Sequence, residues 1–111
     1  MDKIVARTRF FIDETKTALH EQNLRHLKTD MASLLDELHH LKEHIEHAGT
    51  KEQQKILQEH NELFTRLAVC FQYHLAPVEE EHLQEHQQEF FSNWYSTLVP
   101  QLNALKRLLE G

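Results

Sequence analysis

Apolar residues recur every three or four positions along most of the chain, which is the spacing of one face of an amphipathic helix. The first stripe ends near Leu19, and a second begins at Leu24 on the opposite side of a helix extended from the first. We predict a turn at 20–24 in which Asn23 caps the second helix. A single long helix over 3–48 is the alternative, because no Gly or Pro marks the change. The stripes contain Ile4, Thr8, Phe11, Ile12, Thr15, Ala18 and Leu19, then Leu24, Leu27, Met31, Leu34, Leu35, Leu38, Leu41, Ile45 and Ala48.

Clear helix boundaries mark the second half of the chain. Gly49 suits the end of a helix, and Thr50 with Gln53 has the spacing of a capping box that starts the next one. The third helix should end before Pro77, and Pro100 should kink the fourth. The predicted inward-facing residues are Ile56, His60, Leu63, Phe64, Leu67, Phe71, His74 and Leu75, then Leu83, Phe90, Phe91, Trp94, Tyr95, Leu98, Leu102, Leu105 and Leu109.

The pattern therefore predicts an all-α fold, a single domain over residues 1–111. We expect helices at about 3–20, 24–48, 51–76 and 78–110. Short connections make consecutive helices antiparallel, which gives a four-helix, up-down-up-down bundle. The presence of only two Gly and two Pro agrees, since an all-β chain needs many more turn residues.

Composition narrows the classes of partner and compartment. The net charge is −6 and the basic residues are scattered, which argues against nucleic acid as a partner. A single cysteine, Cys70, excludes an internal disulfide and fits the cytoplasm. No apolar run approaches the roughly 18 residues of a membrane span, and no signal peptide is recognisable. We expect a cytoplasmic protein that uses neither membrane nor nucleic acid.

Signatures of catalysis are absent from the sequence. The sequence contains neither G-x-x-x-x-G-K nor G-x-G-x-x-G, the patterns of glycine-rich phosphate loops, and none of the three serines lies beside a plausible base. We expect no cofactor and no enzymatic activity. The leading hypothesis is a small acidic interaction module, an adaptor, chaperone or regulator, that binds a protein partner and could also form a homodimer.

Histidine is unusually frequent, with ten in the chain. The pattern E-x-x-H-L-x-E-H occurs twice, at 37–44 and 79–86, and its spacings can place two ligands on one metal ion. The candidate metal ligands are Glu37, His40, His44, Glu79, His82 and His86. A surface metal site and a buried di-iron centre are alternatives to a solvated polar face. The helical register favours the solvated face, because His40 projects nearly opposite the apolar stripe of its helix.

Two other histidines, His60 and His74, fall on the apolar stripe of the third helix. We predict that both are buried, pH-sensitive core groups, because charging a buried imidazole is unfavourable. Cys70 precedes His74 by one turn, so a pair of metal ligands is the alternative there.

The segment Leu38-His39-His40-Leu41-Lys42, followed by Gly49 ten residues after His39, resembles the His-x-Leu-Lys-Gly…Gly signature of histidine phosphotransfer domains. Those domains are acidic four-helix bundles of similar length. The resemblance covers about a dozen residues and implies that His39 is an exposed phosphate acceptor. Glu43 occupies the position of the first signature glycine, where it adds bulk and negative charge.

The fourth helix carries an aromatic run of Phe90, Phe91, Trp94 and Tyr95. Ordinary core packing would account for it. The alternative is that one edge of this wide apolar stripe stays exposed and forms a surface for another subunit or a partner helix.

Overall fold

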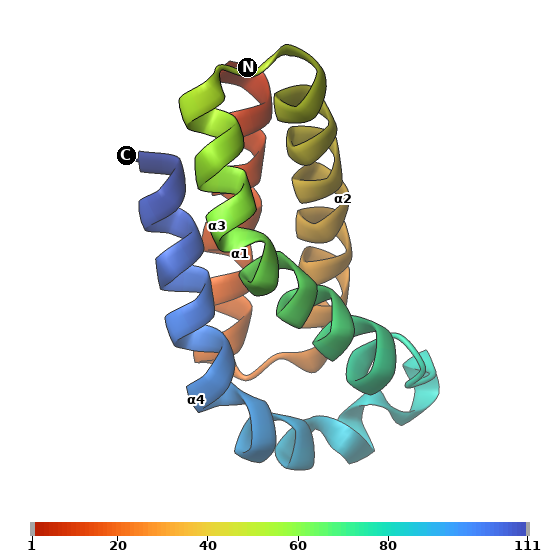
Figure 1. Ribbon diagram of the computed structural model, residues 1–111. Helices are drawn as coiled ribbons and strands as arrows, with labels where there is room; N and C mark the ends of the chain where they lie inside the picture. The colour runs from red at the N-terminus through yellow and green to blue at the C-terminus, as the bar shows by residue number, and fades with distance from the viewer. Residues whose placement is uncertain (1, 111) are drawn as a thin grey trace.

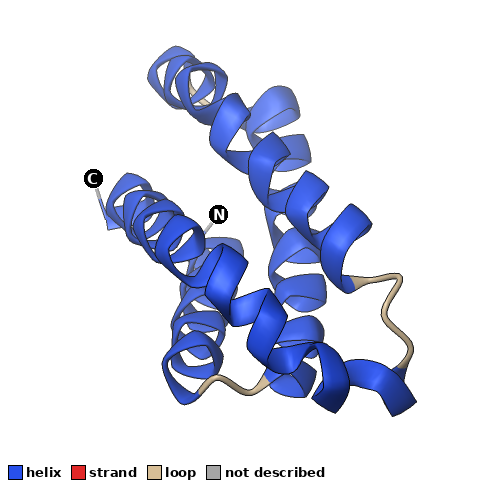
Figure 2. Ribbon diagram, turned by 90° about the horizontal axis from the view of Figure 1, so that it is seen from below, coloured by secondary structure: helices blue, strands red, loops and turns tan. Residues whose placement is uncertain are grey.

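The computed structural model describes the backbone of residues 2–110 and the side chains of residues 3–109, and this part of the chain is all-α (Figure 2). Within it we find no strand. A π-helical turn and a 3-10 turn lie between the third and fourth α-helices. The elements are α1 (Asp2–Glu21), α2 (Leu24–Ala48), α3 (Lys51–Cys70), η1 (Phe71–Leu75, π), η2 (Glu80–His82, 3-10) and α4 (Leu83–Glu110).

The predicted turn between the first two helices is present, so the alternative of one helix over 3–48 is wrong. The left-handed backbone of Gln22, with φ of 55°, reverses the chain after α1. Asn23 then caps α2, because its side-chain oxygen accepts a hydrogen bond of 3.1 Å from the backbone nitrogen of His26. The reversal lets α1 and α2 pack their stripes against each other.

The connection between α2 and α3 also follows the sequence signals. Thr50 and Gln53 form both hydrogen bonds of the capping box. Gly49, however, has an extended backbone with φ of −79°, which any residue can adopt. A glycine is favoured here because there is no room for a side chain, not because of its conformational freedom. A Cβ at this position would lie 2.6 Å from the carbonyl oxygen of Ile45, closer than packing allows.

The end of α3 differs from the predicted regular helix to residue 76. The regular turns stop at Cys70, and the Ala76 nitrogen donates to the Phe71 carbonyl at 2.7 Å, the five-residue step of a π turn. This step places both Cys70 and Leu75 in the core. It also turns His74 to the surface, so the prediction that His74 is buried is wrong.

Helix α4 starts later than predicted and is longer than any other helix. The expected start at 78 is wrong, because Glu79 is extended and a 3-10 turn precedes the first α-helical residue, Leu83. Pro100 does not interrupt the helix. Figure 1 shows that α4 changes direction: its first turns cross beneath the other helices and its last turns run up beside α1.

The predicted stripes form the core with few exceptions. Buried residues of the main cluster come from α1, α2, α3, η1 and α4. Thr8 and Thr15 are buried because each hydroxyl donates to a carbonyl one turn back, those of Ile4 and Phe11. Ala48, predicted on the second stripe, is exposed.

The helices form an elongated body of 46 × 22 × 21 Å in which the two ends differ. In Figure 1 one end carries the α1–α2 turn and the first turns of α4, and we call it the closed end. The other carries both chain termini and the α2–α3 connection, and we call it the open end. Between residues 2 and 110, no helix has the length and apolar character that crossing a membrane requires.

Candidate functional site

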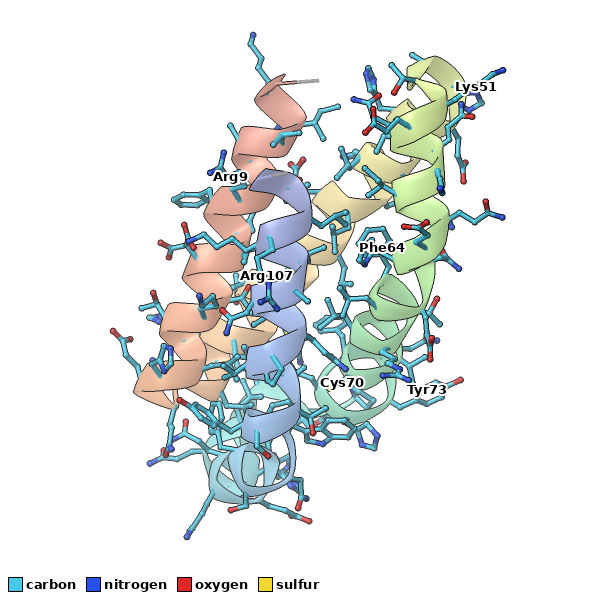
Figure 3. The ribbon with its side chains drawn as sticks, turned by 60° about the vertical axis from the view of Figure 1, so that its left-hand side comes forward. Arg9, Lys51, Phe64, Cys70, Tyr73 and Arg107 are labelled. Atoms are coloured by element: carbon cyan, nitrogen blue, oxygen red, sulfur yellow. The ribbon has the colours of Figure 1, made fainter. Side chains whose placement is uncertain are left out.

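An apolar groove of about 330 Å³ lies at the open end. All four α-helices contribute to it, and most of the side chains that line it are aliphatic or aromatic. Figure 3 shows Phe64 on α3 directed toward the space between α3 and α4. The lining residues are Val5, Leu41, Ile45, Thr50, Glu52, Gln53, Ile56, Leu57, Phe64, Leu108 and Leu109.

The groove arises because the inward face of α3 is only partly covered. Farther along this helix, Leu67 is fully buried and Cys70 is 2% exposed. Nearer its start, Ile56, His60 and Phe64 lie on the same predicted stripe but are half-buried. The predicted stripe included these three residues but missed Leu57, which is 7% exposed, and at the open end the stripe is only partly covered.

The few buried residues here form a separate small cluster. Leu41, Ile45 and Leu57 make up this second core, and Ile4, Val5, Phe64 and Leu109 pack half-exposed around it. Only Phe64 and Leu109 also pack against the main core. The two clusters therefore share two side chains that are themselves partly exposed.

Polar contacts between α3 and α4 do not close the groove. Within the described residues, no hydrogen bond or ion pair joins these two helices. The Nζ of Lys42 on α2 donates to the Oδ1 of Asn61 on α3 at 3.5 Å. Arg66 of α3 pairs with Glu62 of the same helix. The two walls of the groove are therefore held together only by apolar contact deeper in the fold.

The first predicted metal-binding segment does not converge on a site. Glu37 is largely buried and its Oε1 lies 3.4 Å from Nε of Arg7, while its Oε2 is buried without a hydrogen-bond partner. His40 is exposed and His44 is half-buried. Among residues 3–109, these three side chains are not part of any group with metal-binding geometry.

The second segment does bring ligand atoms together. One ligand atom from each of Glu79, Glu81 and His82 lies within 4.8 Å of the other two, and all three side chains are exposed. Glu79 and His82 are two of the ligands predicted from the sequence, whereas Glu81 is not among them. His86 stands apart from this group, with its Nδ1 4.0 Å from a carboxylate oxygen of Glu89.

The proposed phosphate acceptor, His39, is exposed on α2 as the resemblance implies. Its Nε2 lies 3.0 Å from the Oε1 of Glu43, the residue that replaces the signature glycine. A negatively charged carboxylate therefore sits beside the nitrogen that would accept phosphate, which disfavours an incoming phosphoryl group.

The two histidines predicted as core groups have different environments. His60 is half-buried on the groove side of α3. His74 is exposed, with its ring centroid 4.7 Å from that of Trp94. Burial raises the pKa of the Cys70 thiol to about 11, so this side chain is a neutral core group. The alternative of a Cys70–His74 ligand pair fails because one residue is inside and the other outside.

The aromatic run of α4 belongs mainly to the core. Phe90 and Phe91 are 6% and 4% exposed, so these two residues do not form a partner surface. Trp94 and Tyr95 are half-buried, and the Tyr95 hydroxyl lies 2.9 Å from Nδ1 of His20. These contacts fasten α4 to α1 and η1 at the closed end.

The groove could not be predicted as a site from the sequence, because the residues that line it occupy ordinary positions on or beside the apolar stripes. Val5 and Leu108 lie beside the predicted stripes and carry no chemical signature. An indirect signal exists: these apolar positions widen the stripes of α1 and α4 near both termini. A wider stripe does not indicate whether another helix covers the additional apolar surface or leaves it exposed.

Comparison with known proteins gives no match for this chain among protein-family models, curated protein sequences or solved structures.

Proposed function

We propose that this protein is a non-enzymatic interaction module, a four-helix, up-down-up-down bundle whose open end binds an amphipathic helix of a protein partner. The observation that carries this proposal is the apolar groove of about 330 Å³ between α3 and the termini of α1 and α4. A helix laid into a hydrophobic groove is a common mode of protein recognition. We further propose that the protein acts in the cytoplasm, which suits its free thiol, Cys70.

The dimensions of the groove suit a short helix. Its α3 wall runs from Gln53 to Phe64, which at 1.5 Å per residue is ~17 Å, or about three helical turns. A partner with apolar residues at positions i, i+4, i+7 and i+11 would present one apolar face along this length.

Binding would remove apolar surface from water. Val5, Ile56 and Leu108 are half-exposed in the free protein, and burying such surface contributes roughly 25 cal/mol per Å². In contrast, the exposed apolar residue Val69 lies outside the groove, on a different face of α3. A single exposed side chain of this kind is ordinary for a soluble surface and carries no argument.

Titration calorimetry with a synthetic peptide tests the proposal. The peptide has about 15 residues, leucines at i, i+4, i+7 and i+11, and glutamine elsewhere. We expect a Kd in the micromolar range, on the order of −8 kcal/mol. Ile56→Glu combined with Leu108→Glu should abolish binding, because each places a charge on the apolar lining.

The matched control is Val69→Glu, which adds the same charge to the same helix away from the groove. Far-UV circular dichroism of every variant checks the fold. Equal binding by the groove variant and the wild-type protein would refute the groove as the site. Light scattering adds a second readout: a wild-type dimer that Ile56→Glu converts to a monomer would show that a second copy occupies the groove instead.

A metal-binding role is the second candidate, favoured by the convergence of Glu79, Glu81 and His82. Carboxylate and imidazole ligands suit Zn²⁺, but all three are exposed, so affinity should be modest and should fall as the imidazole protonates. Calorimetry with Zn²⁺ at about pH 7.5 and pH 5.5 measures this. Unchanged Zn²⁺ affinity in His82→Gln would exclude this group.

A further inference from the structure

A second groove lies on the surface of the closed end, where the α1–α2 turn and the first turns of α4 are neighbours (Figure 1). Its volume of about 680 Å³ falls within the range of small-molecule sites. Phe91, which is 4% exposed, and the half-buried Tyr95 form part of the lining. Amide and hydroxyl side chains form the rest, and we call the site the glutamine groove: Gln22, Gln84, Gln87, Gln88, Ser92 and Ser96.

One wall of the glutamine groove is a single side of α4. Gln84, Gln88, Ser92 and Ser96 follow one another at intervals of four residues, so they lie in a row along the helix. The other wall is the α1–α2 turn, where Gln22 has the left-handed backbone that reverses the chain.

Two hydrogen bonds hold the walls at a fixed separation. The backbone nitrogen of Leu24 donates to Oε1 of Gln87 at 3.2 Å. The Tyr95 hydroxyl lies 2.9 Å from Nδ1 of His20, near the end of α1. The groove is therefore already formed in the free protein, and a ligand need not pay the entropy of assembling it.

Most of the polar side chains in this groove are not used within the protein. In the described part of the chain, five of them make no hydrogen bond: Gln22, Gln84, Gln88, Ser92 and Ser96. Threonines on the helices behave differently, because their hydroxyls donate to the carbonyl four residues back: Thr8, Thr15, Thr17, Thr29 and Thr65. The amides and hydroxyls of the groove therefore keep their full capacity for a ligand.

The lining favours a ligand without charge. Among residues 3–109, no acidic or basic side chain lines the groove, although charged residues make up 27% of the chain. An anionic ligand would meet no basic partner and a protein of net charge −6. A cationic ligand would meet no lining carboxylate, because Glu85 and Glu89 each project about 100° round α4 from the glutamine before them. An apolar ligand would bury the amides without partners.

We propose that the glutamine groove binds an uncharged, hydroxyl-rich ligand with the chemistry of a short neutral oligosaccharide. Each glutamine amide offers donors and an acceptor, which suits sugar hydroxyls because these also donate and accept. The ring of Tyr95 offers an apolar surface for the C–H face of a pyranose. This site is separate from the groove at the open end and does not depend on the function proposed above.

NMR titration of the full chain with four neutral trisaccharides tests the proposal. They are built from α-linked glucose, β-linked glucose, mannose and N-acetylglucosamine. We expect at least one of them to shift the side-chain amide signals of Gln22, Gln84 and Gln88, while those of Gln58 on α3 stay in place. The Kd should be on the order of 1 mM, because water competes for every hydrogen bond. Trisaccharides of glucosamine and of galacturonate, which are charged, should bind at least about tenfold more weakly at these amides.

Two substitutions each remove one amide from one wall. Gln88→Ala on α4 should weaken binding of the same trisaccharide about fivefold, the effect of one lost hydrogen bond. Gln22→Gly should weaken it similarly without lowering the melting temperature, because glycine adopts the left-handed backbone readily. The matched control is Asn93→Ala, which removes an exposed amide of α4 outside this groove and should leave the affinity unchanged.

Absence of shifts at the groove amides with all four neutral trisaccharides, at up to about 20 mM, would overturn the proposal. Tighter binding of a charged trisaccharide at these amides would overturn it as well. Unchanged affinity in either groove variant, or an equal loss in Asn93→Ala, would show that the sugar binds elsewhere and would also refute it.

Discussion

The two ends of the helical body use the same residue types and reach different degrees of packing. At the closed end Leu24, Leu27 and Leu75 have no exposed surface. At the open end Leu41 is 2% exposed, but Ile45 and Leu57 retain 8% and 7% exposure, and the side chains packed around them are half-exposed. Leucine and isoleucine content alone therefore does not decide whether a core closes.

Polar links join helices at both ends, but α4 differs in its partners: it is linked to α2 and α1, and among the described residues not to α3. At the closed end Lys28 donates to the Val78 carbonyl at 2.6 Å, Gln87 accepts from the Leu24 backbone at 3.2 Å, and Arg25 pairs with Glu80. These contacts bind the segment before α4 and its first turns to α2. Since α3 and α4 share no such contact among the described residues, a movement of α3 away from α4 breaks no hydrogen bond between these two helices there.

The largest difference between the ends should appear when a charge replaces a stripe residue. Leu67→Asp buries a carboxylate without a partner and should cost more than about 4 kcal/mol, enough to unfold a marginally stable domain. Ile56→Asp, on the same helix and stripe, should stay folded because solvent reaches it. Far-UV circular dichroism decides; unfolding of both variants would remove the distinction between the ends.

Cavity-forming substitutions should show a graded version of this contrast. Leu98→Ala removes a fully buried side chain and should cost about 3 kcal/mol. Leu108→Ala removes a half-exposed one and should cost less than about 1 kcal/mol. Urea denaturation gives both values, and similar losses would mean that the open end is as well packed as the closed end.

The helix caps offer a matched pair at the two ends. Asn23→Ala should destabilise the protein by about 1 kcal/mol, because α2 loses its cap where it is packed most tightly. Thr50→Ala removes the equivalent capping hydrogen bond at the start of α3. The loss of stability should be smaller, since fraying of this helix end exposes side chains that are already partly accessible to solvent. A larger loss for Thr50→Ala in urea denaturation would contradict this.

Sequence reasoning recovered the helices and three of their boundaries because local signals determine them. Stripe periodicity, the Asn23 cap and the Thr50–Gln53 capping box all act within a few residues, and the structure contains each. The π turn was missed because it depends on how Cys70 and Leu75 together meet the core. Helical arithmetic on a regular α3 therefore misplaced His74.

The candidate site was less predictable for the same physical reason. Whether Ile56 is covered depends on the direction of α4 relative to α3, and no local pattern encodes that angle. Glu52, which lines the groove, looks like any residue of a solvated helix face until the groove is known.

The smallest expected effect concerns Asp30, on the α1-facing side of α2. Burial raises the pKa of this carboxyl above 3.8, with Glu14 adding to the rise and His26 opposing it. A raised folded pKa means that the native state holds the proton more tightly, so stability is lost as pH rises through that pKa. Asp30→Asn should therefore raise the melting temperature slightly at neutral pH and leave it unchanged near about pH 3. A stabilisation that is equal at both values of pH would rule out this ionisation as the cause.

The central claim is that the open end is a binding surface, and methyl NMR during titration of the leucine–glutamine peptide described above tests it most directly. We predict that saturating peptide shifts the methyl signals of Val5, Ile56 and Leu108, whereas those of Leu27 and Leu98 in the main core stay in place. Shifts confined to Val69, or no shifts at a peptide concentration about tenfold above the expected Kd, would contradict the account.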